Sequence, residues 1–193
     1  VVAATPGQIF TVLPSGGNAD VLYLHPRLAA AALIARVVDE LVKRAELEKA
    51  LSAYADAVGK SLRVVDVRFS RSGALLVRVE GGGYLPYSAL GDGLRASLYY
   101  ALTLSLLEKG VVFIDSPEAY AHPGLVGVLS HAVAASPHQY FIATQSLELI
   151  AGVLAARGGV KVVRMSDCEV VDVLDGDEVR FKLEEVGQDI REV

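Results

Sequence analysis

The fold is decided by two short apolar runs that each end in polar residues. The first reads Val111-Val112-Phe113-Ile114-Asp115-Ser116-Pro117-Glu118, and the second spans residues 140–146 with the letters YFIATQS. Short continuous apolar runs of this kind are typical of strands buried on both faces of a parallel sheet. Ligands bind beyond the carboxyl ends of such strands. We therefore expect Asp115 and the polar residues after Ala143 to lie at the functional edge of a parallel sheet.

Helix and strand patterns alternate around these two runs. The apolar spacing predicts strands over 21–24, 62–69 and 74–80, and helices over 27–42, 47–58, 94–107, 123–132 and 147–156. Ser146 is expected to cap the last of these helices. Residues 70–73 are expected to turn a hairpin. Residues 160–163 and 170–174 are expected to complete the βαβαβ series, with a hairpin tip around Gly176. The predicted fold class is α/β, a layered and mostly parallel sheet flanked by helices.

Composition sets the broad class of protein. The chain has 193 residues, of which 52% are hydrophobic, and a formal net charge of −5. This length suits a single domain over residues 1–193, and the acidic balance argues against a dedicated nucleic-acid surface. No apolar run reaches the ~20 residues of a membrane span. A single cysteine, Cys168, rules out a disulfide framework. We expect a cytoplasmic protein that does not bind membranes.

A glycine-rich turn precedes the helix predicted over residues 94–107. It reads Gly91-Asp92-Gly93 and is followed by Leu94 and Arg95. A helix N-terminus presents free N–H groups to an anion, and glycines let a phosphate approach the backbone closely. The same letters also begin ordinary turns, and Asp115 before Pro117 is equally good turn chemistry. Spacing alone therefore leaves both interpretations open.

Taken in order, these elements resemble the second half of an ABC-class ATPase head of the RecF/SMC/OLD-like kind, within the P-loop NTPase superfamily. Such heads carry a Gly-Asp-Gly signature turn, a Walker B strand ending Asp-Glu-Pro-Glu with His-Pro shortly after, and a strand leading into Thr-His-Ser. The matching letters here are Gly91-Asp92-Gly93, Asp115-Ser116-Pro117-Glu118, His122-Pro123 and Thr144-Gln145-Ser146. The resemblance is specific over about residues 85–150. It implies a region 1–84 ahead of the signature turn, and a region 85–193 with the signature, Walker B and switch strands.

The resemblance also implies roles and ligands. Asp115 would bind Mg²⁺, and the signature turn with Arg95 would contact the γ-phosphate of ATP in a composite site. The phosphate loop of that site would come from a second copy of the chain or from a partner subunit. Glu118 and His122 would shape the loop that faces the dimer. DNA as a partner follows from the habits of the family alone.

Two catalytic positions depart from the family pattern. Ser116 stands where the family has the glutamate that polarises the attacking water, and Gln145 stands where it has the switch histidine. A serine hydroxyl is a poor base near neutral pH, so a general-base contribution of roughly 10²–10⁴ should be missing. Glu118 is a candidate for a partial replacement. We expect hydrolysis to be weak or lost.

The Walker A phosphate loop is expected to be absent. The motif requires Gly-x₄-Gly-Lys-Ser/Thr between a strand and a helix. Gly59-Lys60-Ser61 has Tyr54 at the first glycine position and lies between a helix and a strand, and Gly16-Gly17-Asn18 has no lysine. The chain thus resembles the later portion of an ATPase head. The alternative is a pseudo-ATPase that binds no nucleotide and serves as a structural or protein-interaction module.

Overall fold

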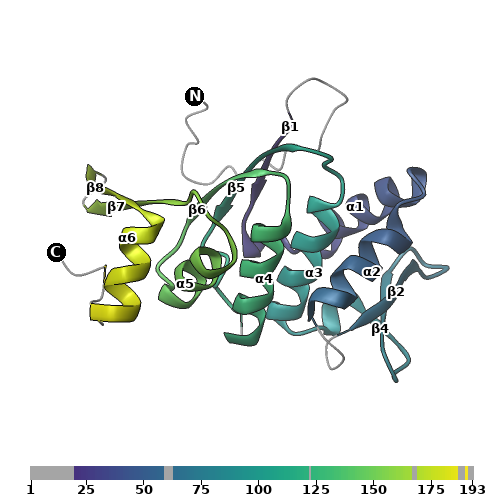
Figure 1. Ribbon diagram of the computed structural model, residues 1–193. Coiled ribbons are helices and arrows are strands. Elements are labelled where there is room, and N and C mark those ends of the chain that lie inside the picture. The colour runs from purple at the N-terminus through teal and green to yellow at the C-terminus, as the bar shows by residue number, and fades with distance from the viewer. Residues whose placement is uncertain (1–19, 59–62, 122, 167–168, 187–189, 191–193) are drawn as a thin grey trace.

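A three-stranded parallel sheet forms the centre of the molecule. The computed structural model describes the chain except for residues 1–19, 59–62, 122, 167–168, 187–189 and 191–193 (Figure 1). The sheet has the order β1-β5-β6, with β1 at Asp20–Leu24, β5 at Gly110–Asp115 and β6 at Gln139–Ala143. Both pairings are parallel. The two apolar runs are therefore neighbouring strands, and the predicted α/β fold class is confirmed.

The two faces of this sheet differ in burial. Leu22, Val112 and Ile114 are at most 1% exposed and join the main hydrophobic core. On the opposite face, Phe113 and Phe141 stack with their ring centroids 5.0 Å apart and remain 40% and 49% exposed. The expectation that these strands are buried on both faces is wrong. Side chains alternate between the faces of a strand, and only one set packs against the core.

Five helices supply most of the remaining core, at the positions that the periodicity predicts. They are α1 (Ala31–Lys43), α2 (Leu47–Val58), α3 (Asp92–Leu104), α4 (Pro123–Ala135) and α5 (Leu147–Ala156). The apolar stripe of α1 places Ile34, Val37, Val38 and Leu41 in the core. As expected, Ser146 caps α5, because its Oγ accepts a hydrogen bond from the Leu149 N–H at 3.1 Å. No helix in the described part of the chain is long and apolar enough to cross a membrane.

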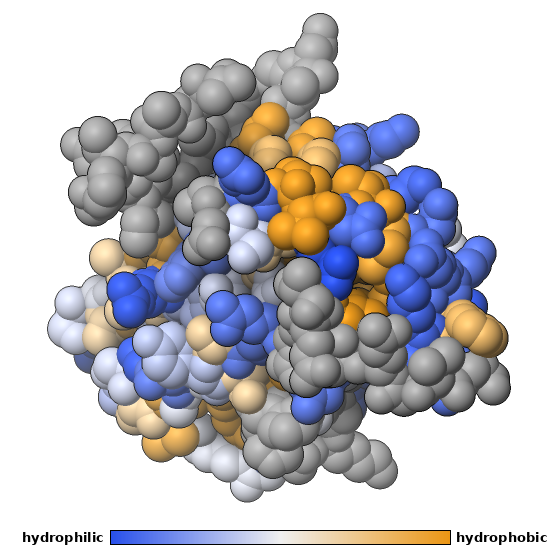
Figure 2. Space-filling view, turned by 90° about the vertical axis from the view of Figure 1, so that its left-hand side faces the viewer, coloured by the Kyte–Doolittle hydropathy of each residue, from blue (hydrophilic) through white to orange (hydrophobic). Residues whose placement is uncertain are grey.

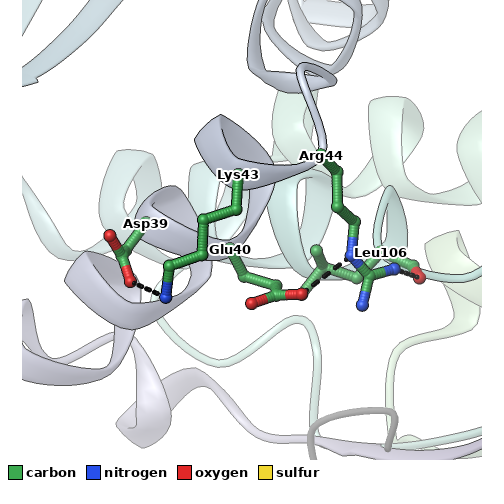
Figure 3. A network of polar contacts seen from close by, with 5 residues as sticks. All are labelled: Asp39, Glu40, Lys43, Arg44 and Leu106. Carbon is green, nitrogen blue, oxygen red and sulfur yellow. Dashed lines mark hydrogen bonds and ion pairs between the residues drawn. The ribbon is translucent and has the colours of Figure 1, made fainter. Parts of the chain in front are cut away.

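Polar contacts join the end of α1 to the segment after α3 (Figure 3). Arg44 forms an ion pair with Glu40, with 2.9 Å between Nε and Oε1, and donates a second hydrogen bond from Nη1 to the Leu106 carbonyl at 3.1 Å. Next to it, Lys43 pairs with Asp39 at 2.6 Å on the exposed side of the helix. Arg44 therefore links two elements, whereas Lys43 makes a pair within a single helix.

A second, antiparallel sheet precedes α3 in the chain. Its order is β2-β3-β4, with β2 at Val64–Phe69, β3 at Leu75–Val79 and β4 at Tyr84–Pro86. The predicted hairpin turn lies between β2 and β3, where Gly73 has a φ of 80°. From β4, the short 3₁₀ turn η3 (Tyr87–Ala89) leads to Gly91, the N-cap of α3. The helix begins at Asp92, two residues earlier than predicted, so Asp92 and Gly93 of the glycine-rich stretch belong to its first turn.

The C-terminal strands do not continue the parallel sheet. The strands β7 (Lys161–Ser166) and β8 (Glu169–Asp175) form an antiparallel sheet of their own. This corrects the expected βαβαβ completion. A parallel crossover needs a dozen or more residues, and the short connection between these two strands permits only a hairpin. One side of the hairpin exposes Val163, Met165 and Val173 by 49–64%, and apolar side chains gather on this end of the molecule (Figure 2).

The expected hairpin tip at Gly176 is also wrong. Helix α6 (Gly176–Phe181) begins there, and the short helical segment η4 (Lys182–Val186) follows. A Cβ at Gly176 would lie 2.7 Å from Leu154 Cδ2 and 2.9 Å from the Val160 carbonyl oxygen, so the backbone packs closely here. Asp177 and Glu178 occupy the first turn of α6, where the helix dipole favours acidic side chains. Asp177 and Glu178 therefore belong to the start of a helix and not to a hairpin tip.

Candidate functional site

Asp115 lies at the carboxyl end of β5, and both of its carboxylate oxygens accept hydrogen bonds. Tyr23 donates from Oη to Oδ2 at 3.1 Å, and Ser116 donates from Oγ to Oδ1 at 3.0 Å. Tyr23 belongs to β1, which pairs with β5 so that Tyr23 is opposite Phe113. Two hydroxyl groups thus fix the orientation of the predicted magnesium ligand.

The loop after Asp115 has two residues in the left-handed backbone region. Ser116 has a φ of 48° and Tyr120 a φ of 68°. Such values are uncommon for residues other than glycine and are enriched at functional sites. The Ser116 N–H donates to the Ala143 carbonyl at 2.8 Å, which joins the start of the loop to the end of β6. The loop conformation is therefore set jointly by β5 and β6.

Glu118 connects this loop to the segment after β6. Its Oε2 accepts a hydrogen bond from Thr144 Oγ1 at 2.7 Å, and its Oε1 accepts one from the Gln145 N–H at 3.0 Å. Thr144 Oγ1 in turn accepts from the Ser146 N–H at 3.0 Å. The predicted Walker B and switch segments are thus in direct contact, as their positions in the parallel sheet require.

Gly93 brings the glycine-rich turn to the same place. A Cβ at Gly93 would lie 2.8 Å from the Tyr120 carbonyl oxygen and 3.2 Å from Leu125 Cδ1. A side chain would therefore collide with the loop that follows Asp115. Gly91 is the N-cap residue of α3 and makes no side-chain cap. The structure thus brings all three predicted segments together at one edge of the sheet.

The two charges at the start of α3 are paired with each other. Arg95 forms an ion pair with Asp92 within the first turns of the helix. The backbone here is held by Tyr87, whose Oη donates to the carbonyl oxygens of Ala29 at 2.9 Å and Arg95 at 3.2 Å. The guanidinium group predicted to support a phosphate is therefore already neutralised in part by a neighbouring carboxylate.

Tyr100 adds a buried hydroxyl beneath the site. It is 4% exposed, and its Oη has no hydrogen-bond partner among the residues that the structure describes. Burial is the main cause that raises its pKa, followed by the charges of Tyr99, Glu118 and Asp115. No local sequence pattern signals that Tyr100 lies near these two carboxylates.

Asp115 fits a Mg²⁺ site of the kind that phosphates and water complete. Mg²⁺ is commonly held by one or two carboxylates together with water and the phosphate oxygens of a substrate. Within the described ranges, no group of three or more His, Cys, Asp or Glu residues is placed to hold a metal. A metal at Asp115 therefore requires oxygen ligands from outside this set. His122, Cys168, Gly59-Lys60-Ser61 and Gly16-Gly17-Asn18 lie outside the described residues.

One curated relative matches the chain closely enough to show a family. It is the uncharacterized protein MJECL11 of Methanocaldococcus jannaschii, which is 32% identical over 113 residues. The match covers 53% of this chain and 99% of the relative. The chain belongs to the same family as MJECL11. No protein-family model matches the chain.

Solved structures show the wider fold of this MJECL11 relative. CbiO1 of Clostridium perfringens, part of the ABC transporter complex CbiONQ, matches with a TM-score of 0.54 and 17% identity, over 86% of this chain and 61% of that structure. The SMC head domain of Thermotoga maritima matches with a TM-score of 0.51 and 11% identity, over 79% and 52%. An Smc head bound to the C-terminal winged-helix domain of ScpA matches with a TM-score of 0.51 and 15% identity, over 77% of this chain and 51% of that structure.

These likenesses establish the fold. The chain has the α/β architecture of SMC and ABC ATPase heads, and it spans about half to three fifths of the length of these three structures. The ABC-like fold expected from the sequence is confirmed. The narrower RecF/SMC/OLD grouping stays a prediction.

Proposed function

We propose that this chain is an ABC/RecF-like ATPase-type domain that contributes the signature turn and the Walker B carboxylate to a composite ATP–Mg²⁺ site. The contact between Gly93 and the loop after Asp115 is the observation that carries this proposal. It adds the glycine-rich turn to the edge where Glu118 already contacts Thr144 and Gln145. Three segments distant in sequence converge there, as a shared ligand would require.

Each part of the site has a role in this proposal. Asp115 binds the metal, and the N-terminus of α3, at Gly91, Asp92 and Gly93, contacts a phosphate with Arg95 as an adjacent charge. When bound, Mg²⁺ offsets the negative charge of the phosphates and orients them. The phosphate loop is supplied by a second copy or by a partner subunit. In support, β6 pairs only with β5 among the described strands, so the sheet can accept another strand at this edge.

Hydrolysis at this site should be slow or absent. The Ser116 hydroxyl donates to Asp115, and serine is a poor base. Both oxygens of Glu118 accept hydrogen bonds from the 144–145 segment, so it would have to leave these bonds to activate water. Gln145 cannot carry a proton. Binding of nucleotide without efficient turnover is therefore the expected behaviour.

The alternative function is a pseudo-ATPase module that binds no nucleotide and acts only through protein contacts. Ser116, Gln145 and the expected absence of a Walker A loop all favour it. A single domain over 1–193, with its regions 1–84 and 85–193, stays a prediction, as does DNA as a partner. The two functions differ in one property, because only the composite site makes assembly depend on ATP.

The test is ATP-dependent association of the native assembly, isolated through an affinity tag on this chain. Light scattering would give its mass with and without ATP and Mg²⁺. We expect ATP to raise the mass of the wild type, and Gly93→Arg or Asp115→Ala to abolish the increase. Lys43→Gln, on the exposed side of α1, is the matched control and should respond like the wild type. An unchanged response in both site variants would refute the assignment.

A further inference from the structure

We propose that the Tyr100 hydroxyl donates a hydrogen bond to an oxygen ligand held at Asp115, which makes Tyr100 a positioning residue that couples α3 to the metal site. The ligand oxygen belongs either to metal-bound water or to a phosphate. This inference rests on the proposed function and deepens it, because it adds a residue to the same site.

The first argument is the position of Tyr100 on α3. Tyr100 follows Gly93 by seven residues, which is close to two turns of an α-helix, so both lie on the same face. Gly93 packs against the Tyr120 carbonyl oxygen, in the loop that follows Asp115. The same face of α3 therefore carries Tyr100, about two turns along from the contact with this loop. Any shift of α3 at its glycine-rich start would move this hydroxyl relative to Asp115.

The second argument is that the Tyr100 hydroxyl is buried without a partner in the described part of the chain. A buried polar atom without a hydrogen bond costs free energy and calls for an explanation. Three other tyrosines around this core have hydrogen-bonded hydroxyls. Tyr23 donates to Asp115, Tyr54 shares a hydrogen bond with Ser97 at 3.1 Å, and Tyr87 donates to two carbonyl oxygens. Unlike these three, Tyr100 has an unused donor.

The third argument is the charge around that donor. Burial is the main cause that raises the pKa of Tyr100, and Tyr99, Glu118 and Asp115 raise it further, so the hydroxyl stays protonated at neutral and mildly alkaline pH. Asp115 already accepts hydrogen bonds from Tyr23 and Ser116, and Glu118 from Thr144 and Gln145. The oxygen of a ligand bound between Asp115 and Glu118 would accept the hydrogen bond that Tyr100 can donate.

The test is Mn²⁺ binding to the native assembly, followed by the paramagnetic resonance signal of free Mn²⁺, with and without ATP. Tyr100→Phe keeps the ring and removes only the hydroxyl. We expect it to weaken Mn²⁺ binding roughly tenfold, the effect of one hydrogen bond in a charged site. Weakening with Mn²⁺ alone identifies the acceptor as metal-bound water, and weakening only with ATP identifies it as a phosphate oxygen.

Tyr87→Phe is the matched control, because it removes a buried hydroxyl that bonds only to backbone carbonyls. It should lower the urea midpoint of unfolding and leave Mn²⁺ affinity unchanged. Tyr100→Phe should instead weaken Mn²⁺ binding and leave the urea midpoint unchanged. If Asp115→Ala weakens Mn²⁺ binding and Tyr100→Phe does not, the inference about Tyr100 is wrong and the proposed function stands. If the wild type shows no Asp115-dependent binding with or without ATP, both are wrong.

Discussion

Gly93 is the residue at which packing and proposed function meet. Its Cα lies against the Tyr120 carbonyl and the Leu125 side chain, so Gly93→Ala forces the loop after Asp115 to move. Overpacking of this kind typically costs about 1–3 kcal/mol. We expect Gly93→Ala to lower the free energy of unfolding by that amount, measured by urea denaturation.

Gly91→Ser is the matched control for this prediction. A Cβ at Gly91 meets nothing within 4 Å, and Gly91 has ordinary extended backbone angles. Serine is also at least as good an N-cap residue as glycine. This variant should therefore be neutral or slightly stabilising. Equal destabilisation by both substitutions would contradict the close approach at Gly93.

At the same scale, the sequence predicted some site residues and could not predict others. Asp115, Gly93 and Gln145 follow a strand or begin a helix, so local patterns point to them. Tyr23 contacts Asp115 only because β1 pairs with β5 in one particular register, which no local pattern specifies. Glu118 accepts hydrogen bonds from Thr144 and Gln145 across a loop in which Ser116 and Tyr120 have left-handed backbone angles. Neither residue is the glycine or asparagine that usually marks such a position.

Between elements, the contact of Arg44 with the segment after α3 should contribute to stability. Its bond to the Leu106 carbonyl is partly buried and joins the end of α1 to the segment after α3, in addition to the pair with Glu40 (Figure 3). Losing a hydrogen bond of this kind costs on the order of 1 kcal/mol. We expect Arg44→Gln to lower the free energy of unfolding by about that amount in a urea titration.

Lys43→Gln provides the comparison. The ion pair between Lys43 and Asp39 is short, at 2.6 Å, but both residues belong to α1 and their side chains are 63% and 57% exposed. Surface pairs within one helix contribute little to stability. The variant should unfold at the wild-type urea concentration. If Lys43→Gln proved as destabilising as Arg44→Gln, the link between α1 and α3 would not be the source of the effect.

Elements were predictable where a single periodicity extends over many residues. The stripes of α1 and α3 and the apolar runs of β5 and β6 are of this kind. The errors concern relations between elements. The pairing of β7 with β8 follows from their short connection, and the exposed Phe113–Phe141 face reflects which side of the sheet packs on the core. At Gly176, where α6 begins, Leu154 and Val160 leave no room for a side chain, and this tertiary contact has no local signal.

For the whole molecule, buried tyrosines predict alkaline instability. The chain has eight tyrosines and no tryptophan. Burial raises the pKa of Tyr54 to about 12, and it also raises the pKa values of Tyr87 and Tyr100. Above pH ~10 the unfolded chain loses these protons while the folded chain keeps them, so the free energy of unfolding falls as pH rises. Below the unfolded pKa the contribution is fully present.

Urea denaturation between about pH 8 and about pH 11 would measure this fall. Tyr54→Phe removes one of the groups and should reduce the fall in the free energy of unfolding above pH ~10, by roughly 1.4 kcal/mol at about pH 11. Absorbance of tyrosinate gives an independent measure without interference from tryptophan. A slope that is unchanged in Tyr54→Phe would show that Tyr54 is not protected from ionisation in the folded state.

The measurement that tests the central claim most directly is the mass of the native assembly with and without ATP and Mg²⁺, for the wild type and Asp115→Ala. In the proposed function, a second phosphate-binding component approaches the sheet edge at which Gly93, Glu118 and Gln145 meet. We predict an increase in mass that requires both ATP and Asp115. An assembly whose mass is the same with and without ATP would contradict the composite site and favour the structural module.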